Sequence, residues 1–126
     1  MLLSGYMYKL SRATIVKEEF VEQEITFLAT YIETENASIV MMSESEDRLG
    51  TLAVAIPQHQ NLASPPLSSI LLGDRNMMVA RVLAELLCQQ TKKIGLASIF
   101  IKFVREQEAA PILRKLLDKT LKKKKS

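Results

Sequence analysis

The sequence predicts an α+β fold, in which an antiparallel β-sheet or compact sandwich of about six strands carries two flanking helices. Short runs of β-branched and aromatic residues fill the first half of the chain, and short polar turns separate them. Two segments of the second half show the apolar spacing of helices, with a further β-branched run between them. Strands with short connections, covered by a few helices, are typical of α+β domains.

The first three strands are expected at residues 6–16, 24–33 and 37–42. In the second of them, the odd-numbered positions from Ile25 to Tyr31 share one apolar face, which predicts a strand with its other face in water. A polar loop follows the third strand.

The next strands are expected at residues 49–56 and 69–72. The run at 49–56 is almost continuously apolar, so we expect it to be buried on both faces and to end at Pro57. An irregular, proline-containing connection joins the two strands.

A helix from Asp74 to about Lys92, a strand at 94–104 and a helix at 106–121 complete the expected order. Asp74 is a good N-cap, because its carboxylate can accept hydrogen bonds from the free N–H groups of the first turn. Gly73 before it is expected to adopt a positive φ. Pro111 must lie in the first turn of the last helix or break it.

The chain is expected to form one domain over residues 1–121, with a disordered lysine-rich tail at 122–126. The net charge is +3, but without Lys122 to Lys125 there are 13 basic against 14 acidic residues. A terminal block of like charge is typically solvated. A nuclear-import patch or a contact with an acidic partner is the alternative.

Composition argues against several classes of protein. The sequence contains no apolar run long enough to span a bilayer and no signal peptide at its start, and its one cysteine fits a reducing compartment. We therefore expect a protein of the cytoplasm, alone or together with the nucleus. Aromatic residues make up 6% and Trp is absent, so the lysines lack the aromatic neighbours of a nucleic-acid surface.

Catalytic chemistry has few candidates in this sequence. The only histidine, His59, has no nearby cysteine or acid to complete a ligand set, and Cys88 lies in an apolar stretch where thiols are usually inert. Phosphate-binding glycine loops and hydrolase or metalloprotease motifs are absent. The sequence thus predicts no enzyme, cofactor, metal or small-molecule substrate.

The helical segment 77–88 is more apolar than a helix that packs on one sheet needs to be. Only Arg81 and Glu85 interrupt it, so its polar strip is one residue wide. Either a sheet and a second helix of the same domain cover it, or a partner protein covers part of it. On the second interpretation the partner-binding residues are expected to be Met77, Met78, Val82 and Leu86.

Four features in a fixed order resemble a known family. They are the strand Leu52-Ala53-Val54-Ala55, the turn Ser68-Ser69-Ile70-Leu71-Leu72-Gly73-Asp74, a helix with Ala80, Leu83 and Ala84, and Lys92-Lys93 before a closing strand. Together they span about residues 49–104 and resemble the proteasome assembly chaperone 4 family.

This resemblance implies a non-enzymatic chaperone with a β-sandwich-like sheet and flanking helices. It also implies a heterodimer with a proteasome assembly chaperone 3 protein, which binds α-type subunits and helps the α-ring of the 20S core particle to assemble. A dimeric scaffold module of the roadblock or longin kind, used in trafficking or signalling, is the alternative for a small α+β protein of this length.

Overall fold

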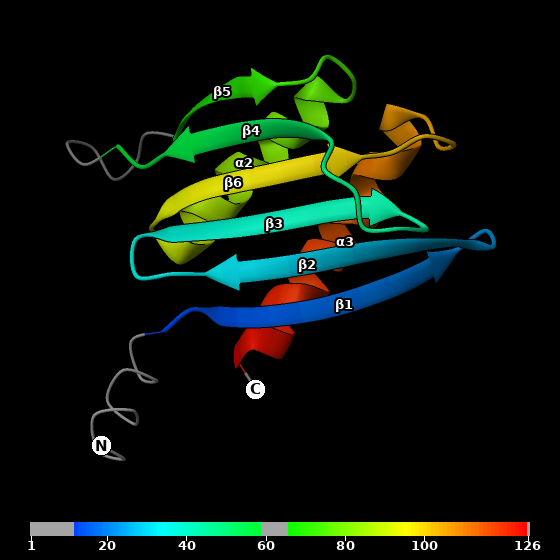
Figure 1. The fold of residues 1–126 in the computed structure, drawn as a ribbon. Helices are drawn as coiled ribbons and strands as arrows, with labels where there is room; N and C mark the ends of the chain where they lie inside the picture. Colours follow the sequence, from blue (N-terminus) through cyan, green and yellow to red (C-terminus); the bar gives the residue numbers. More distant parts are fainter. Residues whose placement is uncertain (1–11, 59–65, 126) are drawn as a thin grey trace.

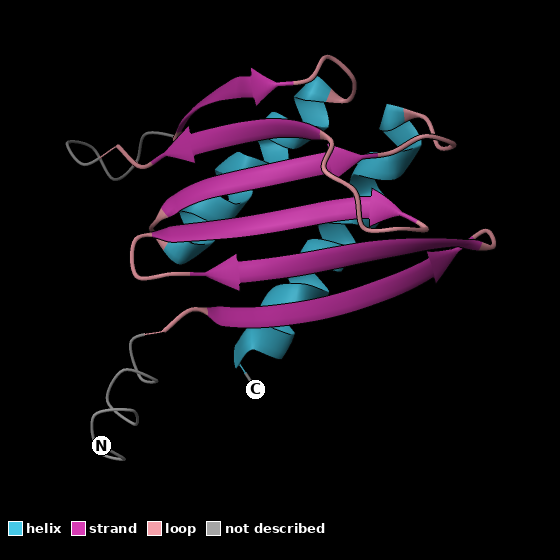
Figure 2. Ribbon diagram, in the orientation of Figure 1, coloured by secondary structure: helices cyan, strands magenta, loops and turns pink. Residues whose placement is uncertain are grey.

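A computed structural model describes residues 12–58 and 66–125 as one six-stranded sheet with two helices against one of its faces (Figures 1 and 2). The elements are β1 (Thr14–Glu22), β2 (Ile25–Glu33), β3 (Ala37–Glu44), β4 (Thr51–Ile56), β5 (Leu67–Leu72), α2 (Met77–Thr91), β6 (Ile94–Phe100) and α3 (Glu106–Lys125). The strand order is β1-β2-β3-β6-β4-β5, and only β3 and β6 pair in parallel. The predicted α+β class is confirmed, as a single sheet.

The first strand lies later in the chain than expected. The structure places β1 at Thr14–Glu22, whereas the predicted strand at 6–16 lies mostly outside the described residues. The observed strand continues through the charged residues Lys17-Glu18-Glu19, beyond the predicted end at residue 16. An edge strand tolerates such charges, and here Glu18 pairs with Lys119 of α3 at 3.5 Å.

Strand β2 was predicted correctly. Phe27, Ala29 and Tyr31 are buried under the helices, and their neighbours in sequence lie on the other face. Gln23 and Glu24 both have positive φ, as the two central residues of a type I′ hairpin turn require.

Strand β6 is inserted between β3 and β4, which places consecutive strands apart. This insertion requires close packing at Gly50, where a Cβ would lie 2.0 Å from the carbonyl oxygen of Ile99. Strand β4 is not buried on both faces as expected: Thr51, Ala53 and Ala55 are buried under α2, but Leu52 and Val54 are only half-buried and Ile56 is exposed. Its apolar run therefore has one uncovered side.

Helix α2 begins at Met77, and Asp74 is not its N-cap. The N-cap position is Asn76, which has φ 59° and makes no side-chain cap hydrogen bond. The carboxylate of Glu106 instead accepts from the backbone N–H of Val79 at 3.0 Å, so the first turn of α3 caps α2. Gly73 has a φ of 92°, as predicted for a tight turn.

Helix α3 differs from the predicted helix in the position of Pro111 and in its C-terminal end. Pro111 lies inside the helix without ending it. The helix also continues to Lys125, so the lysines expected to form a disordered tail extend α3 along β1 and β2. The preceding strand is shorter than expected, since β6 ends at Phe100 and residues 101–105 connect it to α3.

The core lies between the sheet and the two helices. It is built from small and branched residues of α2 and α3 over the inward-facing positions of the central strands. Its most completely buried large side chains are Tyr31, Phe27, Met42, Leu87, Ile99, Leu113, Leu116 and Leu117.

Candidate interaction surfaces

The first surface is the face of the sheet opposite the helices, called here the open face. Both helices lie behind the sheet in Figure 1, and no described element covers the whole of its front. Cross-strand pairing brings one aliphatic row together on this face, because residues paired in register point to the same side. The row runs through Ile15, Ile32, Ile39, Leu96 and Val54.

The side chains of this row are incompletely buried. Ile15 is 64% exposed, and the other four members are half-buried. A parallel row places Thr30, Met41, Ser98 and Leu52 beside it. The open face is therefore largely apolar at its centre and becomes charged at the β1 edge, where Lys17 and Glu19 are its members.

The second surface is a groove between the two helices, on the opposite side of the molecule. Met78, Val82 and Leu86 form its α2 wall, and Ala110 and Pro111 belong to its α3 wall, around a volume of about 510 Å³. The structure thus brings three of the four predicted partner-binding residues together. Met77, the fourth, is exposed at the start of α2 but does not line the groove.

The polar strip of α2 lies beside the β5 edge of the sheet, with Arg81 exposed and Glu85 half-buried. Glu85 accepts a hydrogen bond from the hydroxyl of Ser68 in β5, and Arg81 Nε donates to the same hydroxyl at 3.1 Å. This contact turns the row of Met78, Val82 and Leu86 toward α3, which covers it only partly: Met78 is 73% exposed.

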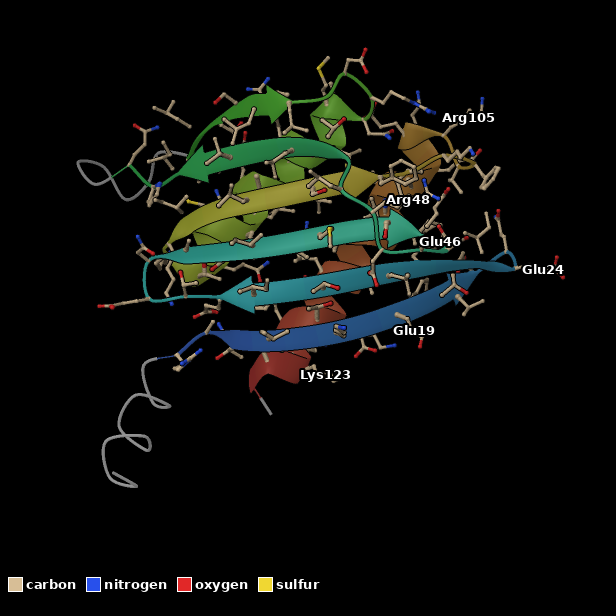
Figure 3. The ribbon with its side chains drawn as sticks, viewed as in Figure 1. Glu19, Glu24, Glu46, Arg48, Arg105 and Lys123 are labelled. Carbon is tan, nitrogen blue, oxygen red and sulfur yellow. The ribbon has the colours of Figure 1, made fainter. Side chains whose placement is uncertain are left out.

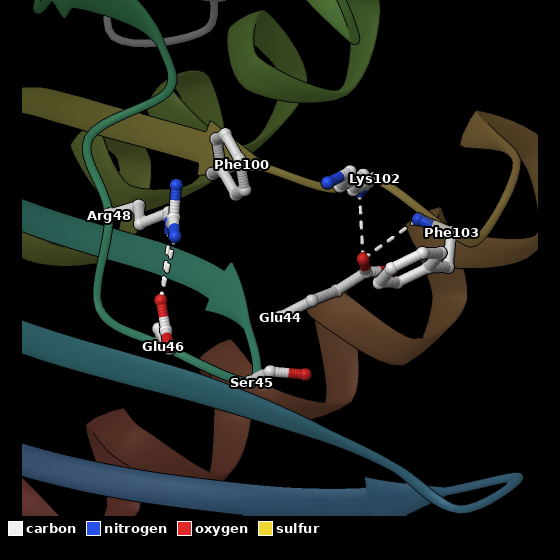
Figure 4. Close-up of a pocket in the computed structure, with 7 residues that line it drawn as sticks. All are labelled: Glu44, Ser45, Glu46, Arg48, Phe100, Lys102 and Phe103. Carbon is white, nitrogen blue, oxygen red and sulfur yellow. Dashed lines mark hydrogen bonds and ion pairs between the residues drawn. The ribbon is translucent and has the colours of Figure 1, made fainter.

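The third surface lies at the end of β3 and β6, where the loop after β3 crosses the sheet. Glu46 and Arg48 of that loop form an ion pair of 2.8 Å (Figure 3), and the guanidinium of Arg48 lies 5.5 Å from the ring centroid of Phe100. Phe100 lies on the open face, because its row joins Ser43 and Leu28. The hollow that these residues share with Lys102 and Phe103 has a volume of about 200 Å³ (Figure 4).

Glu44 fixes one wall of this hollow. Its side chain is almost fully buried, and its carboxylate accepts hydrogen bonds from the backbone N–H groups of Lys102, Phe103 and Val104 at 2.8, 2.8 and 3.2 Å. A carboxylate that receives three main-chain donors holds the backbone of that connection in place.

Glu33 joins the C-terminal end of α3 to the sheet. Burial alone would raise the pKa of Glu33, but the ammonium groups of Lys124 and Lys93 and the hydroxyl of Tyr31 outweigh it and hold the pKa at about 2. The Lys93 contact is 2.7 Å long. Lys123 also donates to the backbone oxygen of Lys17, at 2.8 Å.

The residues considered for catalysis are not assembled into a site. His59 lies outside the described residues. Cys88 is buried between α2 and β6, and burial raises the pKa of its thiol, which disfavours the reactive thiolate. Within residues 12–58 and 66–125, no group of three or more His, Cys, Asp or Glu side chains is placed to hold a metal ion, and no helix is long and apolar enough to cross a bilayer.

Sequence reasoning identified the helical surface but missed the open face and the Glu44 contact. The alternation of β2 indicated one uncovered side, yet the pairing of β3 with β6 joins residues some 57 positions apart, such as Ile39 and Leu96, and no local pattern predicts it. Glu44 falls in the polar loop expected after the third strand, and no local pattern indicates its contact, because its partners lie 58 to 60 residues further along the chain.

Comparison with known proteins shows a likeness in fold, although none in sequence. No protein-family model matches the chain, and no curated protein matches its sequence. A chain in the crystal structure of a novel chaperone complex for yeast 20S proteasome assembly has the same fold, with a TM-score of 0.67 and 16% sequence identity. The match covers 89% of this chain and 97% of the yeast one. The fold is therefore one that a proteasome assembly chaperone complex uses.

Proposed function

We propose that this chain is a non-enzymatic chaperone for assembly of the 20S proteasome α-ring, and that it acts as a heterodimer with a proteasome assembly chaperone 3-like subunit. The observation that carries the proposal is the open face: an apolar sheet surface, crossed at one end by the loop after β3 and otherwise uncovered by the described elements, in a fold shared with a subunit of a yeast assembly chaperone complex.

The size of the open face supports a protein partner. Six strands spaced about 4.8 Å apart, each with about six residues at about 3.3 Å per residue, give a projected area of roughly 500 Å². The apolar centre of the face occupies part of this area, because the β1 edge carries Lys17 and Glu19. The largest apolar patch of a monomer measures about 300–600 Å² and is often an interaction site. A second sheet is the natural cover, because two sheets pack face to face at about 10 Å with interdigitating aliphatic side chains.

The helical groove supplies a separate surface for the α-type subunits. Its α2 wall, with Met78, Val82 and Leu86, lies on the layer opposite the open face, so a dimer joined through the sheets leaves it accessible. Met77 extends the same surface at the start of α2. Methionine adapts to the shape of a partner, which suits a chaperone that binds and then leaves.

Two charged substitutions test the proposal. The chain is co-expressed with a proteasome assembly chaperone 3-like protein and with α-type subunits, and the complexes are separated by size-exclusion chromatography. Ile39→Lys, on the open face, is expected to abolish pairing with the chaperone subunit. Val82→Lys, in the groove, is expected to preserve that pairing and to weaken binding of the α-type subunit.

Lys115→Glu is the control, because Lys115 is exposed on α3 and lines neither surface. Unchanged pairing of the Ile39→Lys variant, with its fold verified by circular dichroism, would overturn the proposal. The proposal would also be overturned if the unmodified chain bound neither the chaperone 3-like subunit nor an α-type subunit.

A further inference from the structure

The connection between β6 and α3 presents an exposed aromatic ring. Phe103 is 71% exposed, and it is the one aromatic side chain among the described residues with so large an exposed fraction. Tyr31 and Phe27 are fully buried, and Phe20 and Phe100 are half-buried. A Phe ring left in water forgoes the free energy of its burial, so its position on this connection calls for an explanation.

The backbone that carries Phe103 is held in place from beneath. The carboxylate of Glu44 accepts from Phe103 N–H and from the N–H groups of the residues on either side of it. Ile101, at the start of the connection, is buried in the core, and Val104 packs against it. The backbone of this connection is already ordered in the free chain. Binding a partner over the ring therefore costs this connection little conformational entropy.

Charges of both signs surround the ring, but the carboxylates there already have partners: Glu46 pairs with Arg48, and Glu44 accepts from three main-chain N–H groups. Lys102 Nζ lies 5.5 Å from the Phe103 ring centroid, and no carboxylate of the described residues lies within ion-pair distance of it. Arg105 follows two residues later and is 81% exposed, although it pairs with Glu108 of its own helix. A partner surface with carboxylates around an apolar pocket is complementary to this arrangement.

The position of the ring connects it to the open face. Phe103 and Phe100 both line the 200 Å³ hollow shown in Figure 4, and Phe100 belongs to the open face. A subunit that covers the open face therefore reaches Phe103 at its rim. The hollow is large enough for one side chain of that subunit.

We propose that Phe103 is an anchor residue for the paired chaperone subunit, inserting into an apolar pocket of that subunit rimmed by Asp or Glu side chains. The inference rests on the proposed function, because it takes the open face as the dimer interface. A second copy of this chain fits less well, since it brings a second Lys102 ammonium, and no further carboxylate to pair with it, to this part of the interface. Buried aromatic anchors commonly dominate the binding energy of an interface.

The test measures the affinity of the chain for a proteasome assembly chaperone 3-like subunit by isothermal titration calorimetry. Phe103→Ala is expected to weaken binding at least tenfold with an unchanged melting temperature, because the ring is exposed in the free chain. Met78→Ala is the matched control: Met78 is equally exposed but lies on the helical layer, and its loss is expected to leave this affinity unchanged. Lys102→Glu is expected to weaken binding more at low than at high salt.

Glu44→Gln tests the positioning of the ring. An amide offers one acceptor oxygen and turns an NH₂ group toward a main-chain donor, so the connection loosens. Hydrogen exchange at the amides of Lys102, Phe103 and Val104 is expected to accelerate, and affinity is expected to fall although Phe103 is intact. Faster exchange with unchanged affinity would show that the contact serves the fold alone and would count against a preorganised anchor.

The outcomes separate this inference from the proposed function. If Ile39→Lys abolishes pairing and Phe103→Ala leaves it unchanged, Phe103 is not an anchor residue, but the dimer joined through the open face is supported. If neither substitution affects pairing, the dimer itself is wrong. If Phe103→Ala affects only binding of an α-type subunit, or only self-association of this chain, the ring serves another occupant and the proposal is overturned.

Discussion

At the scale of single residues, Glu33 joins parts of the chain that are far apart in sequence. It accepts a hydrogen bond from Tyr31 of its own strand and forms ion pairs with Lys93 and Lys124. Burial raises the pKa of Tyr31, and its hydrogen bond to the Glu33 carboxylate raises it further. The carboxylate therefore fixes the last turn of α3 against the end of β2.

This arrangement predicts a specific pH dependence of stability. The pKa of Glu33 is about 2 in the folded chain and lies at its ordinary value near 4.5 when unfolded. The ionised group consequently stabilises the fold above about pH 4.5, and that contribution is lost as the pH falls toward 2. The difference in melting temperature between the unmodified chain and Glu33→Gln is expected to shrink over this range. A difference that stays constant from pH 6 to pH 2 would contradict the assignment.

At the scale of elements, α2 depends on α3 for its first turn. A helix begins with free N–H groups, and here Asn76 is in the left-handed region and makes no side-chain cap. The acceptor for Val79 comes from Glu106, 27 residues later in the chain. The two walls of the helical groove are therefore connected by this hydrogen bond as well as by packing.

Capping by Glu106 predicts an asymmetry between two substitutions. Glu106→Ala is expected to lower the free energy of unfolding by about 0.5–2 kcal/mol, the usual cost of a lost cap. Glu106→Gln retains an acceptor oxygen and is expected to cost much less. Asp74→Ala is expected to stay within about 0.5 kcal/mol of the unmodified chain, because Asp74 lies outside the helix. Urea denaturation measures all three, and a larger effect at Asp74 than at Glu106 would restore Asp74 as the cap.

The end of α3 gives a second prediction at this scale. Deletion of residues 122–126 removes Lys124 from Glu33 and Lys123 from the Lys17 carbonyl oxygen, so the melting temperature is expected to fall by a few degrees. Lys115→Ala, which removes an exposed lysine of the same helix, is the control. An unchanged melting temperature after the deletion would mean that the lysines behave as a solvated tail after all.

At the scale of the whole molecule, the sequence predicted the elements better than their arrangement. The alternation in β2 placed that strand within one residue, because one wet and one buried face leave a local signature. The run at 49–56 suggested burial on both faces, whereas β4 has only half-buried Leu52 and Val54 on the open face. A strand with an uncovered aliphatic face has the same composition as a core strand. The sequence of the strand therefore predicts burial on both faces in either case. The Glu44 and Glu106 contacts depend on tertiary folding and leave no pattern in their own segments.

The open face gives the last prediction, on the behaviour of the isolated chain. An uncovered apolar sheet favours association, so the chain alone is expected to self-associate as its concentration rises. Sedimentation velocity should show a concentration-dependent shift to larger species. Ile39→Lys is expected to suppress that shift, because a charge at the centre of the aliphatic row must be desolvated in any sheet-to-sheet contact. Val82→Lys, in the helical groove, is the matched control and is expected to leave self-association intact. A chain that stays monomeric at high concentration, or one whose association responds to Val82→Lys instead, would show that the open face is not the surface that drives association.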